Sequence, residues 1–159
     1  MVVMKVSGIV LDPQSRTPIL VLRDMEDRRA LLIWIGPPEA NSIMLVLENI
    51  KLSRPATHDL MTNMIKSLKV ELKSVTIHDM KESTFFAQLN LSNNNREVLV
   101  DSRPSDAVAL ALRADVPIYV SEQVMFSSSI PIDQSKDELE AEQFKTFIDS
   151  IKPSDFFKG

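Results

Sequence analysis

Two stretches decide the fold: Ile35-Gly36-Pro37-Pro38-Glu39-Ala40-Asn41 and, later in the chain, Val100-Asp101-Ser102-Arg103-Pro104-Ser105-Asp106. Each begins at the end of an apolar run and passes through a turn into proline. Proline suits the first turn of a helix, because the amide hydrogen that it lacks would have no partner there. The apolar residues that follow, 43–47 and 108–112, have helical composition. Both stretches therefore predict a corner between a strand and a helix.

Outward from each corner, the apolar pattern predicts three preceding strands. The predicted strands are 2–11, 18–22 and 30–35 for the first corner, and 72–77, 84–91 and 97–100 for the second. Helices are expected at 40–47 and 107–114, and a short strand at 117–120. We therefore expect an α+β fold with a duplicated three-strand-plus-helix unit, its copies lying at about residues 1–50 and 66–115.

Other segments complete the predicted organisation. A helix is expected at 57–68, with an apolar face made of Leu60, Met61, Met64, Ile65 and Leu68. Polar turns are expected at 78–83 and 92–95, and a loop at 121–132. We expect Trp34 in the core. Residues 1–132 would form one domain, followed at 133–159 by an additional acidic amphipathic C-terminal helix.

The composition excludes several classes of mechanism. The 159 residues include no cysteine and only three glycines. A disulfide framework, a thiolate nucleophile and a zinc finger are therefore excluded. The sequence cannot contain either the glycine-rich dinucleotide fingerprint or the P-loop motif.

The charge balance sets expectations about partners and location. The formal net charge is −4, with 15 acidic and 14 basic residues in 1–132, so electrostatic attraction to nucleic acid would be weak. No apolar run approaches the roughly 20 residues of a membrane-spanning helix, and the N-terminus lacks a signal-peptide pattern. We expect a cytoplasmic protein without a membrane partner.

Both histidines precede an aspartate, in His58-Asp59 and His78-Asp79. Imidazole and carboxylate both bind divalent cations, and a bound cation can generate hydroxide at neutral pH. The alternative assigns Asp59 to the N-terminal charge of a helix and Asp79 to a hairpin turn, and leaves the histidines half-exposed. The dipeptides alone do not decide between these readings.

The second candidate site lies at the two corners. Polar side chains gather there around free helix N–H groups, a place suited to phosphate or carboxylate, and Arg103 could bind such an anion through two hydrogen bonds. Alternatively, Asp101, Ser102 and Ser105 could cap the helix, and Arg103 could pair with Asp106. Asn41 and Asp106 also lie inside their helices beside apolar stretches, which indicates a hydrogen-bond network or a ligand.

Five stretches carry a resemblance to a known family: Ile33-Trp34-Ile35-Gly36-Pro37-Pro38-Glu39-Ala40-Asn41, Arg54-Pro55-Ala56-Thr57-His58-Asp59-Leu60, Val75-Thr76-Ile77-His78-Asp79, 101–113 and Val116-Pro117-Ile118-Tyr119-Val120. Through these stretches the sequence resembles the bifunctional nuclease family of bacteria and plants. The resemblance implies an α+β fold of two repeats, self-association, here as a favoured dimer, and nuclease activity on RNA and DNA.

Two hypotheses of function follow. The first is a metal-assisted nuclease in which Glu39, Asp59, Asp101 and Asp106 would hold Mg²⁺ or Mn²⁺. His58 would be the general acid or base, with Asp59, Asp101 and Arg103 also catalytic. Asn41, Ser102 and Ser105 would bind the substrate. The alternative is a non-catalytic regulatory or anion-binding module that uses the same polar cluster.

Overall fold

The computed structural model describes residues 1–132, which form one mixed sheet and four helices. The predicted α+β class is confirmed. In chain order the elements are β1 (Val2–Leu11), β2 (Pro18–Asp24), β3 (Arg29–Trp34), α1 (Pro37–Leu47), α2 (Thr57–Ser67), β4 (Glu71–Lys81), β5 (Thr84–Asn93), β6 (Arg96–Ser102), α3 (Pro104–Ala114), β7 (Ile118–Val120), α4 (Glu122–Ser128) and β8 (Ile130–Pro131). The C-terminal helix predicted at 133–159 lies outside the described residues.

The sheet has two antiparallel halves joined by one short strand. Its order is β6-β5-β4-β7-β1-β2-β3-β8, and β7 pairs antiparallel with β1 and parallel with β4. Three strands followed by a helix occur twice, as β1-β2-β3-α1 and β4-β5-β6-α3. This order agrees with the predicted repeat, whereas descent from a duplication stays a prediction. Helix α2 lies between these two units in the chain and belongs to neither.

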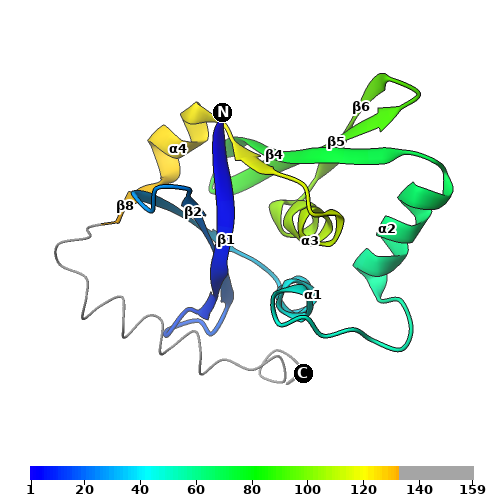
Figure 1. Ribbon diagram of the computed structural model, residues 1–159. Coiled ribbons are helices and arrows are strands. Elements are labelled where there is room, and N and C mark those ends of the chain that lie inside the picture. Colours follow the sequence, from blue (N-terminus) through cyan, green and yellow to red (C-terminus); the bar gives the residue numbers. More distant parts are fainter. Residues whose placement is uncertain (133–159) are drawn as a thin grey trace.

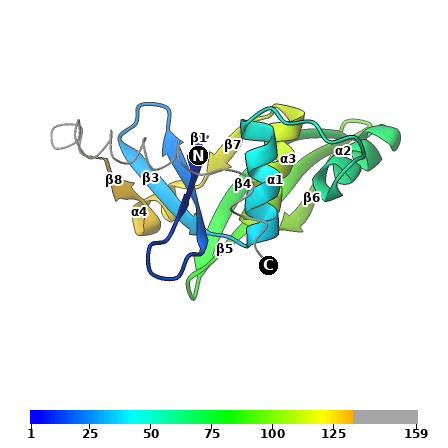
Figure 2. The same ribbon diagram turned by 90° about the horizontal axis from the view of Figure 1, so that it is seen from below.

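The halves of the sheet run in different directions and the helices lie between them. In Figure 1, β1 runs upright whereas β4 and β5 cross the top of the view, with α3 and α1 in the angle between them. Helix α3 packs on β4 and β5, α1 packs on β1 and β2, and both α1 and α2 contact α3. Figure 2 shows α1 and α3 side by side from below. One hydrophobic core includes residues of both halves, among them Leu20, Ile43, Val75 and Leu110.

Several local predictions were wrong. The expected loop at 121–132 contains α4 and β8, because the Ser121 hydroxyl accepts the amide hydrogen of Val124 and caps a short helix with a buried face. Trp34 is 53% exposed, and its indole donates to Asp12. The expected turn at 78–83 is shorter, since β4 continues to Lys81. Within the described part of the chain, no helix is long and apolar enough to cross a membrane.

The two hairpins of the second half have two-residue loops with the same backbone form. Glu82 and Ser83 have φ of 50° and 62°, and Asn94 and Asn95 have φ of 49° and 63°. Two consecutive positive φ values are typical of a type I′ turn, which favours asparagine and glycine. Glutamate and serine are therefore poorly suited to the first turn, whereas the asparagine pair suits the second.

We predict that Glu82→Asn combined with Ser83→Gly raises the free energy of unfolding by about 1 kcal/mol, because the turn no longer strains two side chains. Urea denaturation followed by circular dichroism measures the change. The reciprocal control, Asn94→Glu with Asn95→Ser, should lower stability by a similar amount. Equal stability of all three proteins would contradict the turn assignment.

Candidate functional site

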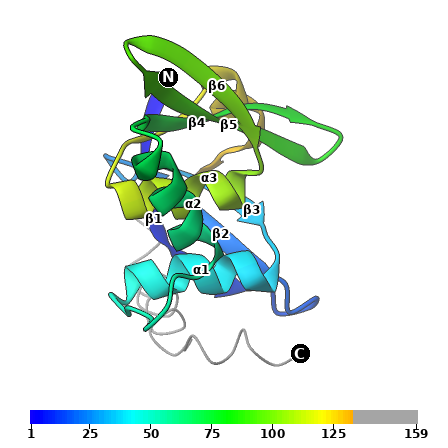
Figure 3. The ribbon, with the colours of Figure 1, turned by 90° about the vertical axis from the view of Figure 1, so that its right-hand side faces the viewer.

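Three helices meet at the candidate site, and prolines set where two of them begin. Helices α1 and α3 start with proline after the extended residues Gly36 and Arg103, and neither start has a side-chain cap. The predicted capping by Asp101, Ser102 or Ser105 is therefore absent. Figure 3 shows α2 extending from the level of α3 toward α1.

A cavity of about 1020 Å³ opens where α1, α2 and α3 meet, and we call it the helix-junction cavity. It is lined by Pro37, Pro38, Glu39, Asn41, Ser42, Leu45, Leu52, Ala56, Thr57, His58, Met61, Arg103 and Asp106. By area most of this wall is apolar, although seven of its thirteen residues carry a polar or charged side chain. A ligand site usually has this composition, because the apolar wall excludes water and the polar groups orient the ligand.

One residue from each helix forms a hydrogen-bonded triad in the cavity wall. Nδ1 of His58 lies 2.6 Å from the Ser42 hydroxyl, and Nε2 of His58 lies 2.9 Å from Oδ1 of Asp106. The side chains of His58 and Asp106 are 7% and 22% exposed, and Ser42 is buried. His58 is the only buried residue of α2. The triad thus uses both nitrogens of a buried imidazole to join three helices.

Arg103 favours the ionised form of Asp106, the carboxyl group of the triad. Its guanidinium binds Glu39 at 2.6 Å and Asp106 at 2.8 Å. Burial works to raise the pKa of Asp106, but hydrogen bonds from Arg103 and His58 outweigh burial and hold that pKa below its ordinary value. Hydrogen bonds to Asp106 and Glu39 raise the pKa of Arg103. Asp106 is therefore a carboxylate at neutral pH.

The ionised Asp106 also determines which imidazole nitrogen carries hydrogen. A carboxylate can only accept, so Nε2 of His58 donates to Asp106. In the neutral imidazole Nδ1 then accepts the hydroxyl hydrogen of Ser42. This is the connectivity of an activated hydroxyl: a base bonded to it and a carboxylate that orients the base.

A second polar network holds the same helices on the other side of α2. The guanidinium of Arg113, 7% exposed, donates from Nε to Asp59 at 2.8 Å and from its terminal nitrogens to the carbonyls of Ala109 and Ser42. A hydrogen bond from Arg113 lowers the pKa of Asp59, whose other oxygen accepts the Ala56 amide hydrogen at the start of α2. Asp59 therefore lies beside Arg113, away from the triad.

The structure gathers Glu39, Asn41, His58, Arg103 and Asp106 at one cavity, and it places the other predicted site residues elsewhere. Asp101 and Ser102 belong to strand β6, and Ser105 is buried in α3 next to a smaller pocket. Within residues 1–132, no group of three or more histidine and acidic side chains is arranged to hold a metal ion. The proposed metal ligands Asp59 and Asp101 thus do not join Glu39 and Asp106.

Two details of the cavity bear on ligand binding. The side-chain oxygen of Asn41 is buried and has no hydrogen-bond partner among the described residues, so it can accept a hydrogen bond from a ligand. A Cβ atom at Gly36 would lie 2.5 Å from Oε2 of Glu39. Glycine at this corner therefore leaves room for the carboxylate that binds Arg103.

Sequence reasoning missed two residues of the site, Ser42 and Arg113. Ser42 is one of many serines, and nothing near it in the sequence marks it as a partner of His58. Arg113 does carry a signal, because it is the only charged residue after the apolar run 107–112 within helix α3. A buried end of that helix would have required a carboxylate partner for it.

The Asp59–Arg113 pair makes stability depend on pH. Because folding holds the pKa of Asp59 below its ordinary value of 3.8, its stabilising contribution is complete above that pH and is lost as the pH falls through the lower pKa of the folded state. We predict that Asp59→Asn lowers the free energy of unfolding by about 1 to 2 kcal/mol at pH 7. The difference from the unsubstituted protein should shrink below about pH 4.

Urea denaturation at pH 7, 5 and 3 provides the measurement. Asp79→Asn is the matched control, since Asp79 pairs with the exposed Lys81 at 3.4 Å and its loss should cost less than about 0.5 kcal/mol. A difference for Asp59→Asn that is constant from pH 7 to pH 3 would show that the ion pair does not contribute as stated.

Comparisons with known proteins identify the family. The family model of the bifunctional nuclease domain matches residues 20–133. An uncharacterized protein of Mycobacterium tuberculosis (strain ATCC 25618 / H37Rv) is 41% identical over 160 residues, which cover 96% of each chain. Bifunctional nuclease 1 of Arabidopsis thaliana is 32% identical over 123 residues, and bifunctional nuclease 1 of Oryza sativa subsp. indica is 29% identical over 150. These matches cover 74% and 83% of this chain, and 38% and 45% of the plant proteins. The chain belongs to the bifunctional nuclease domain family.

Proposed function

We propose that this protein hydrolyses phosphodiester bonds of RNA or DNA at the helix-junction cavity. The observation that carries the proposal is the position of His58, whose two nitrogens bind Ser42 and Asp106 in the wall of that cavity. The names of the plant relatives, bifunctional nucleases, support the same class of reaction. In this proposal Ser42 is the nucleophile, His58 the general base and acid, and Asp106 the residue that orients His58.

The proposed reaction has two steps. The Ser42 oxygen forms a bond to phosphorus while its proton passes to Nδ1 of His58, and the bond from phosphorus to the leaving oxygen breaks. The leaving oxygen takes the proton from His58. In the second step His58 takes a proton from water and the water oxygen forms a bond to phosphorus. The bond from phosphorus to the Ser42 oxygen breaks, and that oxygen takes the proton back from His58. Arg103, at the cavity wall, stabilises charge on the phosphate oxygens.

The divalent cation expected from the sequence stays a prediction. Among the described residues, the acidic side chains that line the helix-junction cavity are Glu39 and Asp106, and both bind the guanidinium of Arg103. An added ion would have to compete with that guanidinium. Within residues 1–132 no group of side chains is arranged to hold a metal ion, so the steps above are written without one. Self-association as a dimer likewise stays a prediction.

The test uses the two histidines as a matched pair. We predict that His58→Gln lowers kcat at least about 100-fold, because the base is lost. His78→Gln changes the exposed histidine, which does not line the helix-junction cavity, and should leave cleavage unchanged. Labelled single- and double-stranded RNA and DNA are incubated in Mg²⁺, Mn²⁺ or EDTA, and the products are resolved on gels. Thermal melts verify that each variant is folded.

Ser42→Ala tests the nucleophile and should lower kcat about 1000-fold. Cleavage by Ser42→Ala with loss in His58→Gln would assign the attack to water. If the purified protein cleaves no substrate under any of these conditions, or if His58→Gln cleaves as fast as the unsubstituted protein, the nuclease proposal fails.

One observation favours a second candidate function, a non-catalytic regulatory or anion-binding module. The triad and Arg103 satisfy one another and tie three helices together, as a structural network does. In that case Asp106→Asn would lower the melting temperature strongly while no variant changed turnover, because there would be none.

A further inference from the structure

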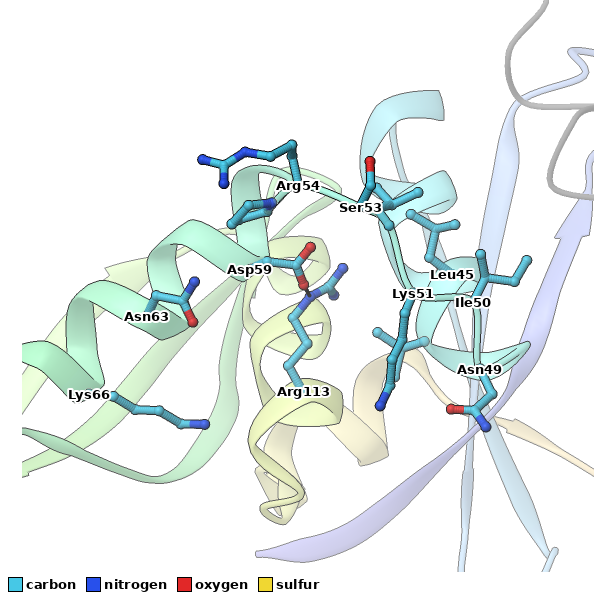
Figure 4. A pocket seen from close by; sticks show the side chains of 13 residues that line it. Leu45, Asn49, Ile50, Lys51, Ser53, Arg54, Asp59, Asn63, Lys66 and Arg113 are labelled. Atoms are coloured by element: carbon cyan, nitrogen blue, oxygen red, sulfur yellow. Dashed lines mark hydrogen bonds and ion pairs between the residues drawn. The ribbon is translucent and has the colours of Figure 1, made fainter.

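A second cavity, of about 650 Å³, lies on the other side of the segment that connects α1 to α2. Four basic side chains line it, Lys51, Arg54, Lys66 and Arg113, and we call it the cationic cavity. Figure 4 shows Lys51 and Lys66 extending from opposite walls, with Arg113 between them and Arg54 at the rim. The sequence alone does not indicate this cavity, because its four basic residues come from three separate segments of the chain.

The charge of this cavity is opposite to that of the molecule. Its lining holds four basic residues and one acidic residue, Asp59, whereas the whole chain carries −4. Within residues 1–132, Lys51, Arg54 and Lys66 form no ion pair with an acidic side chain. Lys51, Arg54 and Lys66 therefore leave positive charge uncompensated in this lining, so an anion in this space would be stabilised.

The wall of the cavity is fixed rather than formed by long surface side chains alone. Arg113 is nearly fully buried, and Asp59 and two backbone carbonyls take three of its N–H groups. Lys51 follows a defined helix end: Asn49 has φ of 56°, and the Ile50 amide donates to the carbonyl of Leu45. This arrangement is a Schellman motif, which fixes the direction of the chain that leaves α1.

The two cavities adjoin each other. Leu45 and Leu52 line both of them. On α2 the consecutive residues His58 and Asp59 belong to different cavities, His58 to the triad and Asp59 to the pair with Arg113. A ligand that extends past this shared wall would contact the triad at one point and the basic side chains at another.

The lining also indicates which part of a nucleic acid would occupy the cationic cavity. None of the described residues that line it is aromatic, so they offer no aromatic ring on which a base could stack. Lysine and arginine bind phosphate oxygens irrespective of base identity. The cavity therefore suits the sugar–phosphate backbone rather than a base.

We propose that the cationic cavity holds a backbone phosphate of a nucleic-acid strand. A neighbouring phosphodiester bond of the same strand lies in the helix-junction cavity. The choice of nucleic acid as ligand rests on the proposed function. Lys51 and Lys66 supply mobile charge from the two walls, and Arg113, which is paired with Asp59, forms the fixed part of the wall between them. Binding through this cavity is independent of base sequence and weakens with salt.

The test measures binding of a fluorescein-labelled 12-nucleotide oligodeoxythymidylate by fluorescence polarisation, at salt concentrations from 50 mM to 1 M. We predict that Lys51→Gln and Lys66→Gln each weaken binding about fivefold to tenfold at 50 mM salt. Each substitution should also reduce the steepness of the plot of log affinity against log salt by about 0.7, which corresponds to one lost phosphate contact. The oligonucleotide is checked on a gel afterwards for its length.

Lys81→Gln is the control, because Lys81 is an exposed lysine that lines neither cavity. Lys51→Gln and Lys66→Gln remove exposed side chains without a described ion pair, so both variants should keep the native melting temperature. Affinities and salt slopes equal to those of Lys81→Gln would overturn the proposal. Binding that depends on the lysines but occurs with one base sequence only would also overturn the proposal.

The same proteins separate this inference from the proposed function. If cleavage requires His58 but oligonucleotide binding does not depend on Lys51 and Lys66, the nuclease proposal stands and the proposed phosphate site is wrong. Binding that depends on both lysines, without any cleavage, would keep the phosphate site and remove the nuclease proposal.

Discussion

The imidazole of His58 is the point on which the arrangement of the three helices depends. It is buried, and it bonds to Ser42 on α1 and to Asp106 on α3. Leaving a buried polar group without a partner would cost roughly 1 to 3 kcal/mol. Each of the three helices is therefore held where its own residue completes the hydrogen bonds of the triad. Helix α2 buries no other residue and thus owes its position to polar contacts more than to an apolar face.

The next residue of α2, Asp59, connects the helices through a second polar network. His58 faces the triad, whereas Asp59 holds Arg113, which in turn binds the carbonyl of Ser42. Ser42 is therefore bonded through its hydroxyl to one network and through its backbone to the other. Because the networks share Ser42, a displacement of α1 would disturb the catalytic candidate residues and the wall of the cationic cavity together.

Much of the fold could be predicted from local patterns, because local chemistry determines it. Prolines at 37 and 104 begin α1 and α3, and the runs of apolar and β-branched residues give β1, β2, β3 and β5 nearly at their bounds. The wrong predictions of local structure also come from reading local chemistry alone. Asp101 and Ser102 have the composition of a helix start but continue β6, and Ser121 caps a helix that the sequence left as a loop.

The site was less predictable, because its bonds join residues that are distant in the chain. Ser42 lies 16 residues before His58, and Asp106 lies 48 residues after it. The sequence singled out His58, Asp106 and Arg103 by residue type and position, yet it offered no reason to choose Ser42. It also predicted an apolar face on α2, where Leu60, Met64 and Leu68 are more than half exposed. Only contacts between helices decide which side of such a helix is covered.

The short strand β7 has a consequence for how the molecule assembles. It is the sole strand between β1 and β4 in the described sheet, yet it follows α3 near residue 120. During synthesis, each antiparallel half can pair its own strands as soon as they leave the ribosome, but the halves can be joined in one sheet only after β7 emerges. Contacts between such distant segments form slowly. The junction of α1, α2 and α3 should therefore reach its final form late, after both halves exist.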